Sequence, residues 1–406
     1  HRVMLVIDES HRIKRFRGGI WAPALLEIAK YARVKIILSG TPMPQSGKDL
    51  YTQLNILWPS GELTGPRDSF TARIDKDFAS VLRDIQPFVS RTPKESLGLP
   101  PYEVVKHEIP ITRTQAEIYD LIESNFRRRV EGATSWQEKL DTLRRARPIR
   151  LLQAATNPDL LNKTDSYYRL PRIAMPNPTL MERLAAYRVS DVPAKSQAAL
   201  GLVHRIAERG EKVVCWSNFV PNLDQFSELV RHTATLPCFQ IDGRVPAGDE
   251  ALDDLPDRLQ PNPDDTDTRE RIIEQFLGTS GPAVLVTNPA SCSESISLHS
   301  NCHNAVYLDR TYDCALFLQS IDRIHRLGLP EGARVQIHIL LATLDGRATV
   351  DHLVDQALQR KETKMKRLLE GAELLPFEMS EDPLDTAQGS KEDLADLLRF
   401  LLGEET

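Results

Sequence analysis

The chain has 406 residues, enough for two or three domains that each bury a core. Its formal net charge of −6 excludes a generally basic nucleic-acid coat, so any binding of nucleic acid must come from local patches. The five cysteines form no CxxC pair, and no apolar run approaches the about 18 residues that a membrane span needs. We therefore expect a cytoplasmic protein with no membrane partner, associated with the nucleoid if the source is a prokaryote.

The N-terminal residues predict a βαβ unit. Residues 3–7 are a continuous apolar run, typical of a strand buried on both faces of a parallel sheet, and residues 34–38 form a second such run. Residues 21–31 between them have the composition of a crossover helix.

Polar residues follow both predicted strands. Asp8-Glu9-Ser10-His11 comes after the first strand, and Ser39-Gly40-Thr41-Pro42 comes after the second. Ligands of open parallel sheets bind beyond the carboxyl ends of the strands. Asp8 is therefore placed to hold a magnesium ion, and Glu9 to orient or deprotonate an attacking water. An Asp-Glu pair after a strand is common, so this signal is weak alone.

A stretch near the other end combines helical spacing with two arginines. Residues 319–328 follow a strand-like run at 305–309, and their apolar side chains recur at helical intervals. Arg323 and Arg326 are three positions apart, which predicts that they share one face of a helix. Two guanidiniums on one face suit the phosphate oxygens of a nucleotide. The alternative is a solvated basic helix with ordinary ion pairs.

These segments resemble the motifs of a known family. Asp8 to His11, Ser39 to Pro42 with residues 50–59, and residues 319–328 resemble, in order, motifs II, III and VI of the Swi/Snf-type helicase-like ATPases, which are superfamily two translocases of double-stranded DNA. The likeness covers roughly residues 3–370, and further segments resemble landmarks of the family: 91–95, 99–100, 115–119 and 155–160.

The resemblance implies an α/β fold of two RecA-like lobes with parallel sheets, the first lobe incomplete, and a helical insertion between them. The domains expected are a partial first lobe at 1–111, a helical protrusion and linker at 112–195, a second lobe at 196–370 and an acidic tail at 371–406. Within them we expect 102–111 to be a strand that returns to the first lobe, 163–195 to be a linker, and the acidic 246–268 to be a surface loop. The strands expected in the second lobe are 213–216, 239–241, 284–287, 306–308 and 335–340.

The resemblance also implies a site that uses ATP and Mg²⁺. Catalysis is expected from Asp8, Glu9, Arg323 and Arg326, with Asp8 holding the magnesium. Nucleotide binding and coupling are expected from Ser10, His11, Ser39, Gly40, Thr41 and Gln319. Double-stranded DNA is the expected partner, and the residues predicted to contact it are Arg144, Arg145, Thr287, Ser291 and Ser293.

Other arginines of the helical region are further candidates for phosphate contacts, and solvated helix faces are the alternative for each: Arg127, Arg128, Arg129, Arg147 and Arg150.

One segment departs from the family pattern. Residues 287–298 occupy the place of motif V, where relatives have a Gly-rich turn, but this chain offers serines. The cysteines and histidines between 292 and 314 invite a zinc interpretation, but their spacing fits no standard tetrahedral pattern and buried structural thiols are the preferred interpretation.

The sequence holds no Gly-rich loop ending in Gly-Lys-Ser/Thr, which binds the phosphates in such motors. Residues 40–48 resemble one only superficially. We expect a longer chain or a separate polypeptide to supply this loop, with further subunits open as partners. Two alternatives remain: a strand-separating DNA or RNA helicase, and a catalytically silent nucleic-acid-binding scaffold. The tail either docks a partner or caps the second lobe.

Overall fold

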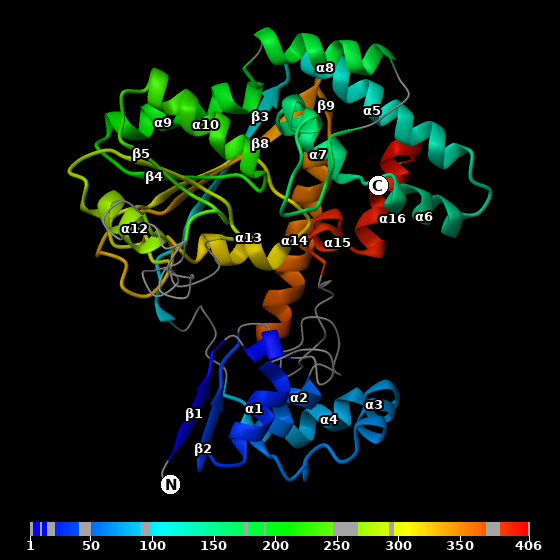
Figure 1. Ribbon diagram of the computed structural model, residues 1–406, viewed down its shortest axis with the longest axis vertical. Helices are drawn as coiled ribbons and strands as arrows, with labels where there is room; N and C mark the ends of the chain where they lie inside the picture. Colours follow the sequence, from blue (N-terminus) through cyan, green and yellow to red (C-terminus); the bar gives the residue numbers. More distant parts are fainter. Residues whose placement is uncertain are drawn as a thin grey trace, which may run out of the picture. The chain divides into compact units, whose positions relative to one another are not determined.

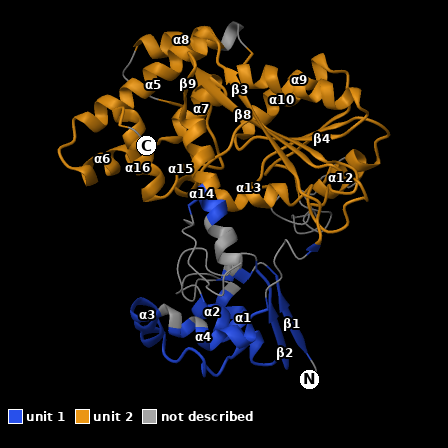
Figure 2. Cartoon of the chain, turned by 180° about the vertical axis from the view of Figure 1, so that it is seen from behind, with its two compact units in different colours: residues 1–97, 360–382 blue, residues 98–359, 383–406 orange. Residues whose placement is uncertain are grey.

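The computed structural model describes residues 3–8, 10–13, 21–39, 50–90, 97–173, 178–190, 192–246, 267–291, 296–370 and 382–404. The chain forms two compact units (Figure 2), one of residues 1–97 with 360–382 and one of residues 98–359 with 383–406. None of the described helices is long and apolar enough to cross a membrane.

The first unit contains the predicted βαβ arrangement. Strands β1 (Met4–Ile7) and β2 (Val34–Ile37) pair in parallel and are connected through α1 (Trp21–Ala29). A short 3-10 helix, η1 (Ser10–Ile13), follows β1. The rest of the described unit is helical: α2 (Leu50–Leu57), α3 (Arg67–Lys76), α4 (Phe78–Ile85) and η3 (Gln86–Phe88).

One face of this two-stranded sheet is partly exposed, as judged from the side chains that the structure describes. Leu5 and Ile7 pack with Ala29 and Ile56 on the covered face. On the other face Met4 pairs with Val34 and Val6 with Ile36, and these four side chains are 38% to 56% exposed. The expectation that residues 3–7 are buried on both faces is therefore wrong for this unit, because α1 and α2 cover only one side.

The second unit is built on a seven-stranded sheet (Figure 1). Its strand order is β3-β8-β7-β4-β6-β5, these strands pair in parallel, and β9 adds an antiparallel ribbon to β8. The strands are β3 (Glu103–Pro110), β4 (Val213–Trp216), β5 (Cys238–Ile241), β6 (Val284–Thr287), β7 (Asn304–Tyr307), β8 (Gln336–Leu344) and β9 (Arg347–Ala348). The predicted α/β class with parallel sheets is confirmed.

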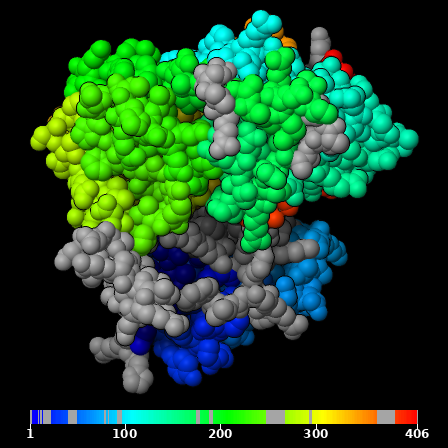
Figure 3. Space-filling model, turned by 45° about the horizontal axis from the view of Figure 1, so that its top comes forward, coloured from blue at the N-terminus to red at the C-terminus, as the bar shows by residue number. Residues whose placement is uncertain are grey.

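Helices cover both faces of this sheet. Leu202 of α9 (Ala194–Glu208) and Phe226 of α10 (Val220–Thr233) join the strand side chains of the main core, and these green-coloured helices lie on the face seen in Figure 3. On the other side Tyr307 packs against Phe317 of α13 (Cys314–Ile321), with ring centroids 5.2 Å apart. The unit also contains α12 (Arg269–Gly278) and the first part of α14 (Val350–Glu370), whose residues from Arg360 onward belong to the first unit.

The strand predicted to return to the first lobe lies instead in the second sheet. Residues 103–110 form β3, which pairs along its whole length with β8, from Glu103 opposite Gln336 to Pro110 opposite Thr343. The prediction that 102–111 belongs to the first lobe is wrong, because sheet membership depends on a partner more than two hundred residues away along the chain.

A helical insertion follows β3, as predicted. It consists of α5 (Arg113–Glu131), α6 (Trp136–Arg145), α7 (Ile149–Thr156), η5 (Pro158–Asn162) and α8 (Pro178–Ser190). The linker expected at 163–195 is wrong, since α8 buries Leu180, Leu184 and Tyr187 and the segment before it buries Leu170. The prolines on either side of α8 are typical of a linker, so the sequence does not indicate this packing.

The end of the chain packs on the insertion. After α15 (Pro383–Gln388), helix α16 (Lys391–Leu402) begins with a Ser390 and Asp393 capping box and buries Leu394, Leu397 and Leu401. It contacts α5 and α6, so this part of the predicted tail caps its own unit.

Candidate functional site

The two strands of the first sheet are linked at their carboxyl ends. The Ser10 N–H donates to the Leu38 carbonyl at 2.9 Å, and the Leu38 N–H donates to the Ile7 carbonyl at 2.8 Å. The Ser10 side chain is buried, and its hydroxyl donates to Oε1 of Gln53 on α2 at 2.9 Å. The segments predicted to be motifs II and III are therefore joined through Ser10. Gln53 was not expected to be its partner, and the nucleotide-binding role of Ser10 stays a prediction.

Asp8 lies at this carboxyl edge and is exposed, while Ser39, which follows β2, is half-buried. Carboxylate oxygens are ligands that Mg²⁺ prefers, so Asp8 has the donor chemistry for the predicted ion. Glu9, Gly40 and Thr41 lie outside the described residues, as does the side chain of His11, and their roles stay predictions.

The predicted helix over 319–328 ends early. Helix α13 stops at Ile321 with Asp322 as its C-cap, and Arg323 and Arg326 lie in the turns that follow. The reason is tertiary: the Arg323 carbonyl accepts a hydrogen bond from the N–H of Leu298 at 2.9 Å instead of continuing the helix. The prediction that both arginines share a helical face is wrong. Gln319 remains on α13, half-buried.

Both arginines contact the segment that begins at Ile296, in the region that resembles motif V. Nη1 of Arg323 donates to the Ile296 carbonyl at 3.2 Å, and Nη1 of Arg326 donates to the Ser297 hydroxyl at 2.7 Å. Arg326 is exposed and Arg323 is half-buried. The two segments resembling motifs V and VI thus form one structure, in which Arg326 is the more accessible cation.

A histidine lies beside this turn. Gly328 has a φ of +94°, and a Cβ at that position would come within 2.9 Å of Nε2 of His299. Burial, together with the nearby charges of Arg326 and His303, lowers the pKa of His299. A neutral His299 therefore adds no positive charge beside Arg326, and glycine is required at 328 by both conformation and space.

Polar residues gather at the carboxyl edge of the second sheet. Asp309, after β7, is fully buried and accepts hydrogen bonds from the Asn218 N–H at 2.7 Å and from the Ser217 hydroxyl, both after β4. Burial raises the pKa of Asp309, while these donors oppose the rise. Thr287, at the end of β6, is buried, and its carbonyl accepts from the Ser217 N–H at 3.2 Å. Asp309 and Ser217 were not singled out from the sequence.

The predicted nucleic-acid contacts divide into exposed and buried groups. Thr287 and Ser291 are buried, and the Ser291 carbonyl accepts from Arg269 at 3.1 Å; Ser293 lies outside the described residues. Arg144 and Arg145, in the last turn of α6, are exposed.

Arg150 is not a surface cation. It is 4% exposed, donates to Oε1 of Gln153 at 2.7 Å and also bonds the Pro171 carbonyl. Burial, with Arg147 nearby, lowers the pKa of Arg150 to about 10. Its inclusion among candidate phosphate contacts is wrong, because a helix pattern does not reveal which arginine faces the interior.

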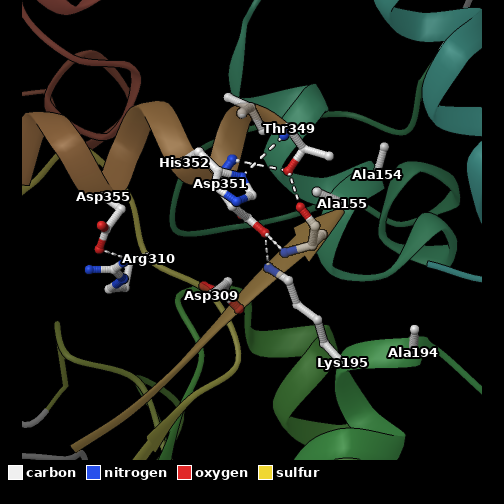
Figure 4. A network of polar contacts seen from close by, with 12 residues as sticks. Ala154, Ala155, Ala194, Lys195, Asp309, Arg310, Thr349, Asp351, His352 and Asp355 are labelled. Carbon is white, nitrogen blue, oxygen red and sulfur yellow. Dashed lines mark hydrogen bonds and ion pairs between the residues drawn. The ribbon is translucent and has the colours of Figure 1, made fainter. Parts of the chain in front are cut away.

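A buried polar network fixes the start of α14 (Figure 4). Nζ of Lys195, on α9, lies 2.5 Å from Oδ2 of Asp351, and neither side chain is more than 4% exposed. The same Asp351 oxygen accepts from the Ala342 N–H of β8 at 2.8 Å. Farther along α14, Asp355 pairs with Arg310 at 2.7 Å. The sequence gives no local signal for this network, whose partners are distant along the chain.

Gln115, part of a predicted landmark, joins three helices. Its Nε2 donates to the Ala154 and Ala155 carbonyls at 3.1 and 3.0 Å, and its Oε1 accepts from the Ala194 N–H at 3.5 Å. The buried Gln115 side chain therefore connects α5, α7 and α9 through hydrogen bonds.

The thiols considered for zinc are structural within the described residues. Cys302 and Cys314 are buried thiols, and their sulfurs lie 3.7 Å and 3.9 Å from the carbonyl oxygens of Asn304 and Leu358. Burial raises the pKa of Cys302 to about 12. Cys292 lies outside the described residues.

Parallel sheets with polar groups beyond their carboxyl ends place the chain in the α/β class whose ligands bind at that edge. Residues 1–159 match the model of the SNF2-related domain. The chain is homologous to SWI/SNF-type ATP-dependent helicases.

Two relatives illustrate the homology. The chain is 22% identical over 370 residues to an uncharacterized ATP-dependent helicase of Mycoplasma pneumoniae, with 90% of this chain and 30% of the relative aligned. It is 22% identical over 346 residues to the putative ATP-dependent helicase/translocase YwqA of Bacillus subtilis, with 82% of this chain and 32% of the relative aligned. The chain thus spans about a third of the length of these relatives.

Among solved structures, the SWI2/SNF2 ATPase core of Sulfolobus solfataricus in complex with dsDNA is 19% identical, with a TM-score of 0.44, over 95% of this chain and 72% of that chain.

Proposed function

We propose that this chain is the part of an ATP-dependent translocase of double-stranded DNA that carries the hydrolytic carboxylates and the phosphate-neutralising arginines. Two RecA-like lobes hydrolyse ATP between them, with Asp8 and Glu9 on the first and Arg323 and Arg326 on the second. The observation that carries the proposal is the place of Asp8 at the carboxyl edge of β1, in a chain homologous to SWI/SNF-type ATP-dependent helicases.

Each residue has a distinct task in this mechanism. Asp8 holds the magnesium ion, which when bound offsets phosphate charge. Glu9 orients the attacking water and accepts its proton. Arg326 donates to the transferred phosphate, and Arg323 fixes the turn that carries Arg326 through its bond to the Ile296 carbonyl. Ser10 keeps the strand ends together through Gln53.

The triphosphate also needs a phosphate-binding loop, and the sequence contains none. We propose that a further segment or a separate polypeptide supplies it and completes the first sheet. The partly exposed face formed by Met4, Val6, Val34 and Ile36 supports this, because parallel sheets are normally covered on both faces.

DNA is proposed to be held by its backbone, with sequence-independent and salt-sensitive contacts. The exposed Arg144 and Arg145 supply two of these contacts. Lobe movements, sensed through Ser39, Gly40 and Thr41, convert hydrolysis into movement along the duplex.

The test is hydrolysis by the assembly that includes the phosphate-binding segment. Glu9→Gln is expected to abolish DNA-stimulated ATP hydrolysis while ATP binding, measured with a fluorescent analogue, stays within about twofold of wild type. Asp68→Asn, an exposed carboxylate on α3, is the matched control and should hydrolyse normally. Normal turnover in Glu9→Gln would remove Glu9 from the mechanism.

A strand-separating helicase is the second candidate, favoured by the names of the Mycoplasma and Bacillus relatives. Tailed duplexes discriminate between the two, since a duplex translocase releases no single strand but displaces the third strand of a triplex. A silent scaffold, the third candidate, would bind DNA and show no hydrolysis even in the complete assembly.

A further inference from the structure

The turn that carries Arg323 and Arg326 also holds a buried histidine. His325 is 5% exposed, whereas its neighbour Arg326 is exposed. The N–H of His325 donates to the Ile321 carbonyl at 3.0 Å, so the backbone keeps a helical turn beyond the end of α13. One turn therefore directs an imidazole into the unit and presents the Arg326 guanidinium at the surface.

The imidazole binds a backbone carbonyl. Nε2 of His325 lies 2.6 Å from the carbonyl oxygen of Pro100. Because a carbonyl oxygen only accepts, Nε2 carries the hydrogen and donates it. The ring also contacts Tyr102 in an edge-to-face arrangement, with the ring centroids 5.0 Å apart and the planes at 70°. His325 is therefore held against two residues of one short segment.

This segment is the one through which the chain enters the second unit from the first. The second unit begins at Gly98, and its strand β3 begins at Glu103, whose N–H donates to the Val335 carbonyl at 2.9 Å. Residues 98–102, the entry segment, thus lie between the unit boundary and the sheet. A displacement that reaches the second unit along this connection acts first on the segment that His325 binds.

Packing alone does not explain an imidazole at this position. Nδ1 of His325 is buried and has no hydrogen-bond partner among the residues that the structure describes. A buried acceptor without a donor costs free energy, which an apolar side chain of similar size would avoid. The hydrogen bond to Pro100 is what an apolar side chain could not replace.

We propose that His325 is a positioning residue that couples the entry segment to Arg326. The inference rests on the proposed role of Arg326 in ATP hydrolysis. The hydrogen bond from His325 to the Pro100 carbonyl holds one side of the turn. The bond from Arg326 to the Ser297 hydroxyl holds the other side. Release of the entry segment loosens the turn, and Arg326 then loses its alignment with the transferred phosphate.

The test is a double-mutant cycle on ATP hydrolysis by the assembly that includes the phosphate-binding segment, measured in single turnovers with the enzyme in excess. His325→Leu removes the donor and should slow hydrolysis by about ten- to a hundredfold, the scale of a small misplacement of a catalytic group. ATP binding should stay within about twofold of wild type. In the Arg326→Ala background the same change should slow hydrolysis by less than about twofold, because the group through which His325 acts is absent.

Three further variants separate the hydrogen bond from the fold. His325→Gln keeps an N–H that can donate to the Pro100 carbonyl, so it should recover most of the rate. Tyr102→Ala leaves His325 in place and removes the ring against it, so it should also slow hydrolysis, and only where Arg326 is present. His204→Leu, a change at an exposed histidine of α9, is the matched control and should hydrolyse like wild type.

Two outcomes overturn the inference. The first is equal hydrolysis by wild type, His325→Leu and Tyr102→Ala. The second is the same fold loss from His325→Leu with and without Arg326, which would make the ring a structural element only. A wild-type assembly that hydrolyses no ATP is a different result, because it would overturn the proposed function and this inference with it.

Discussion

Nη1 of Arg326 donates a hydrogen bond to the hydroxyl of Ser297 at 2.7 Å. The contact joins the turn after α13 to the segment before His299, two regions that resemble different motifs of the Swi/Snf-type ATPases. It holds an exposed guanidinium in a defined direction, and orientation matters for a group that must reach a phosphate.

Arg326→Ala should stop ATP hydrolysis in the complete assembly, with a loss of about 10³-fold or more, because a phosphate-neutralising arginine contributes on that scale. Ser297→Ala should lower kcat by a smaller factor, since it removes only the support of Arg326. Steady-state phosphate release measures both. Arg113→Ala, a residue whose side chain is 94% exposed, serves as the control. Undiminished hydrolysis in Arg326→Ala would make the turn an ordinary surface element.

The arginines of the helical insertion should differ in their effect on DNA binding. Arg144→Ala and Arg145→Ala should each weaken duplex binding and reduce the slope of log affinity against log salt by about one, as expected for a lost phosphate contact. Arg150→Ala should leave that slope unchanged but destabilise the unit, since it orphans the Pro171 carbonyl. Fluorescence anisotropy at several salt concentrations measures the slopes, and unchanged slopes in both surface variants would remove α6 from the interface.

The elements that the sequence predicts well are those with local signals. The apolar runs at β4, β6 and β7 are strands because each lies in the buried interior of a sheet, where every residue must be apolar or bonded. The βαβ unit of β1 and β2 follows from similar runs and their spacing.

The elements that were missed depend on distant partners. Helix α13 ends where the Arg323 carbonyl accepts from the N–H of Leu298. Strand β3 belongs to the second sheet because it pairs with β8. Arg150 is buried where it bonds the Pro171 carbonyl. In the site, Asp8 and the two arginines are recognisable by motif, whereas Gln53 is linked to Ser10 only by the fold.

The pair formed by Lys195 and Asp351 should behave as a buried ion pair. Lys195→Met leaves the Asp351 carboxylate buried without its cation and should cost about 3–5 kcal/mol of unfolding free energy. Adding Asp351→Asn should restore part of this, because the amide oxygen still accepts from the Ala342 N–H without a buried charge. Urea unfolding followed through the buried Trp216 measures the effect. Arg113→Met, which breaks an exposed pair with Glu117, should cost less than about 1 kcal/mol. Equal losses of unfolding free energy in Lys195→Met and Arg113→Met would show that Lys195 and Asp351 do not behave as a buried ion pair.

The stability of the second unit should fall in mild acid because of a histidine pair. Nε2 of His107 on β3 lies 3.1 Å from Nδ1 of His338 on β8. Burial, the neighbouring His107 and the charges of Arg209 and Arg205 lower the pKa of His338 to about 4, although Glu103 opposes the shift. Burial also lowers the pKa of His107.

The direction in which the unfolding free energy changes with pH follows from proton binding to the folded and unfolded chains. A depressed pKa means that the unfolded chain binds the proton first, so the contribution of His338 is complete above about pH 6.5 and is lost as the pH falls toward about 4. The full loss is about 3 kcal/mol at most. Urea midpoints measured across this range should rise with pH in wild type and less steeply in His338→Gln, which keeps a hydrogen-bonding side chain. His232→Gln, a change at a side chain that is 75% exposed, should leave the wild-type slope intact. A slope as steep in His338→Gln as in wild type would show that other groups carry the acid sensitivity.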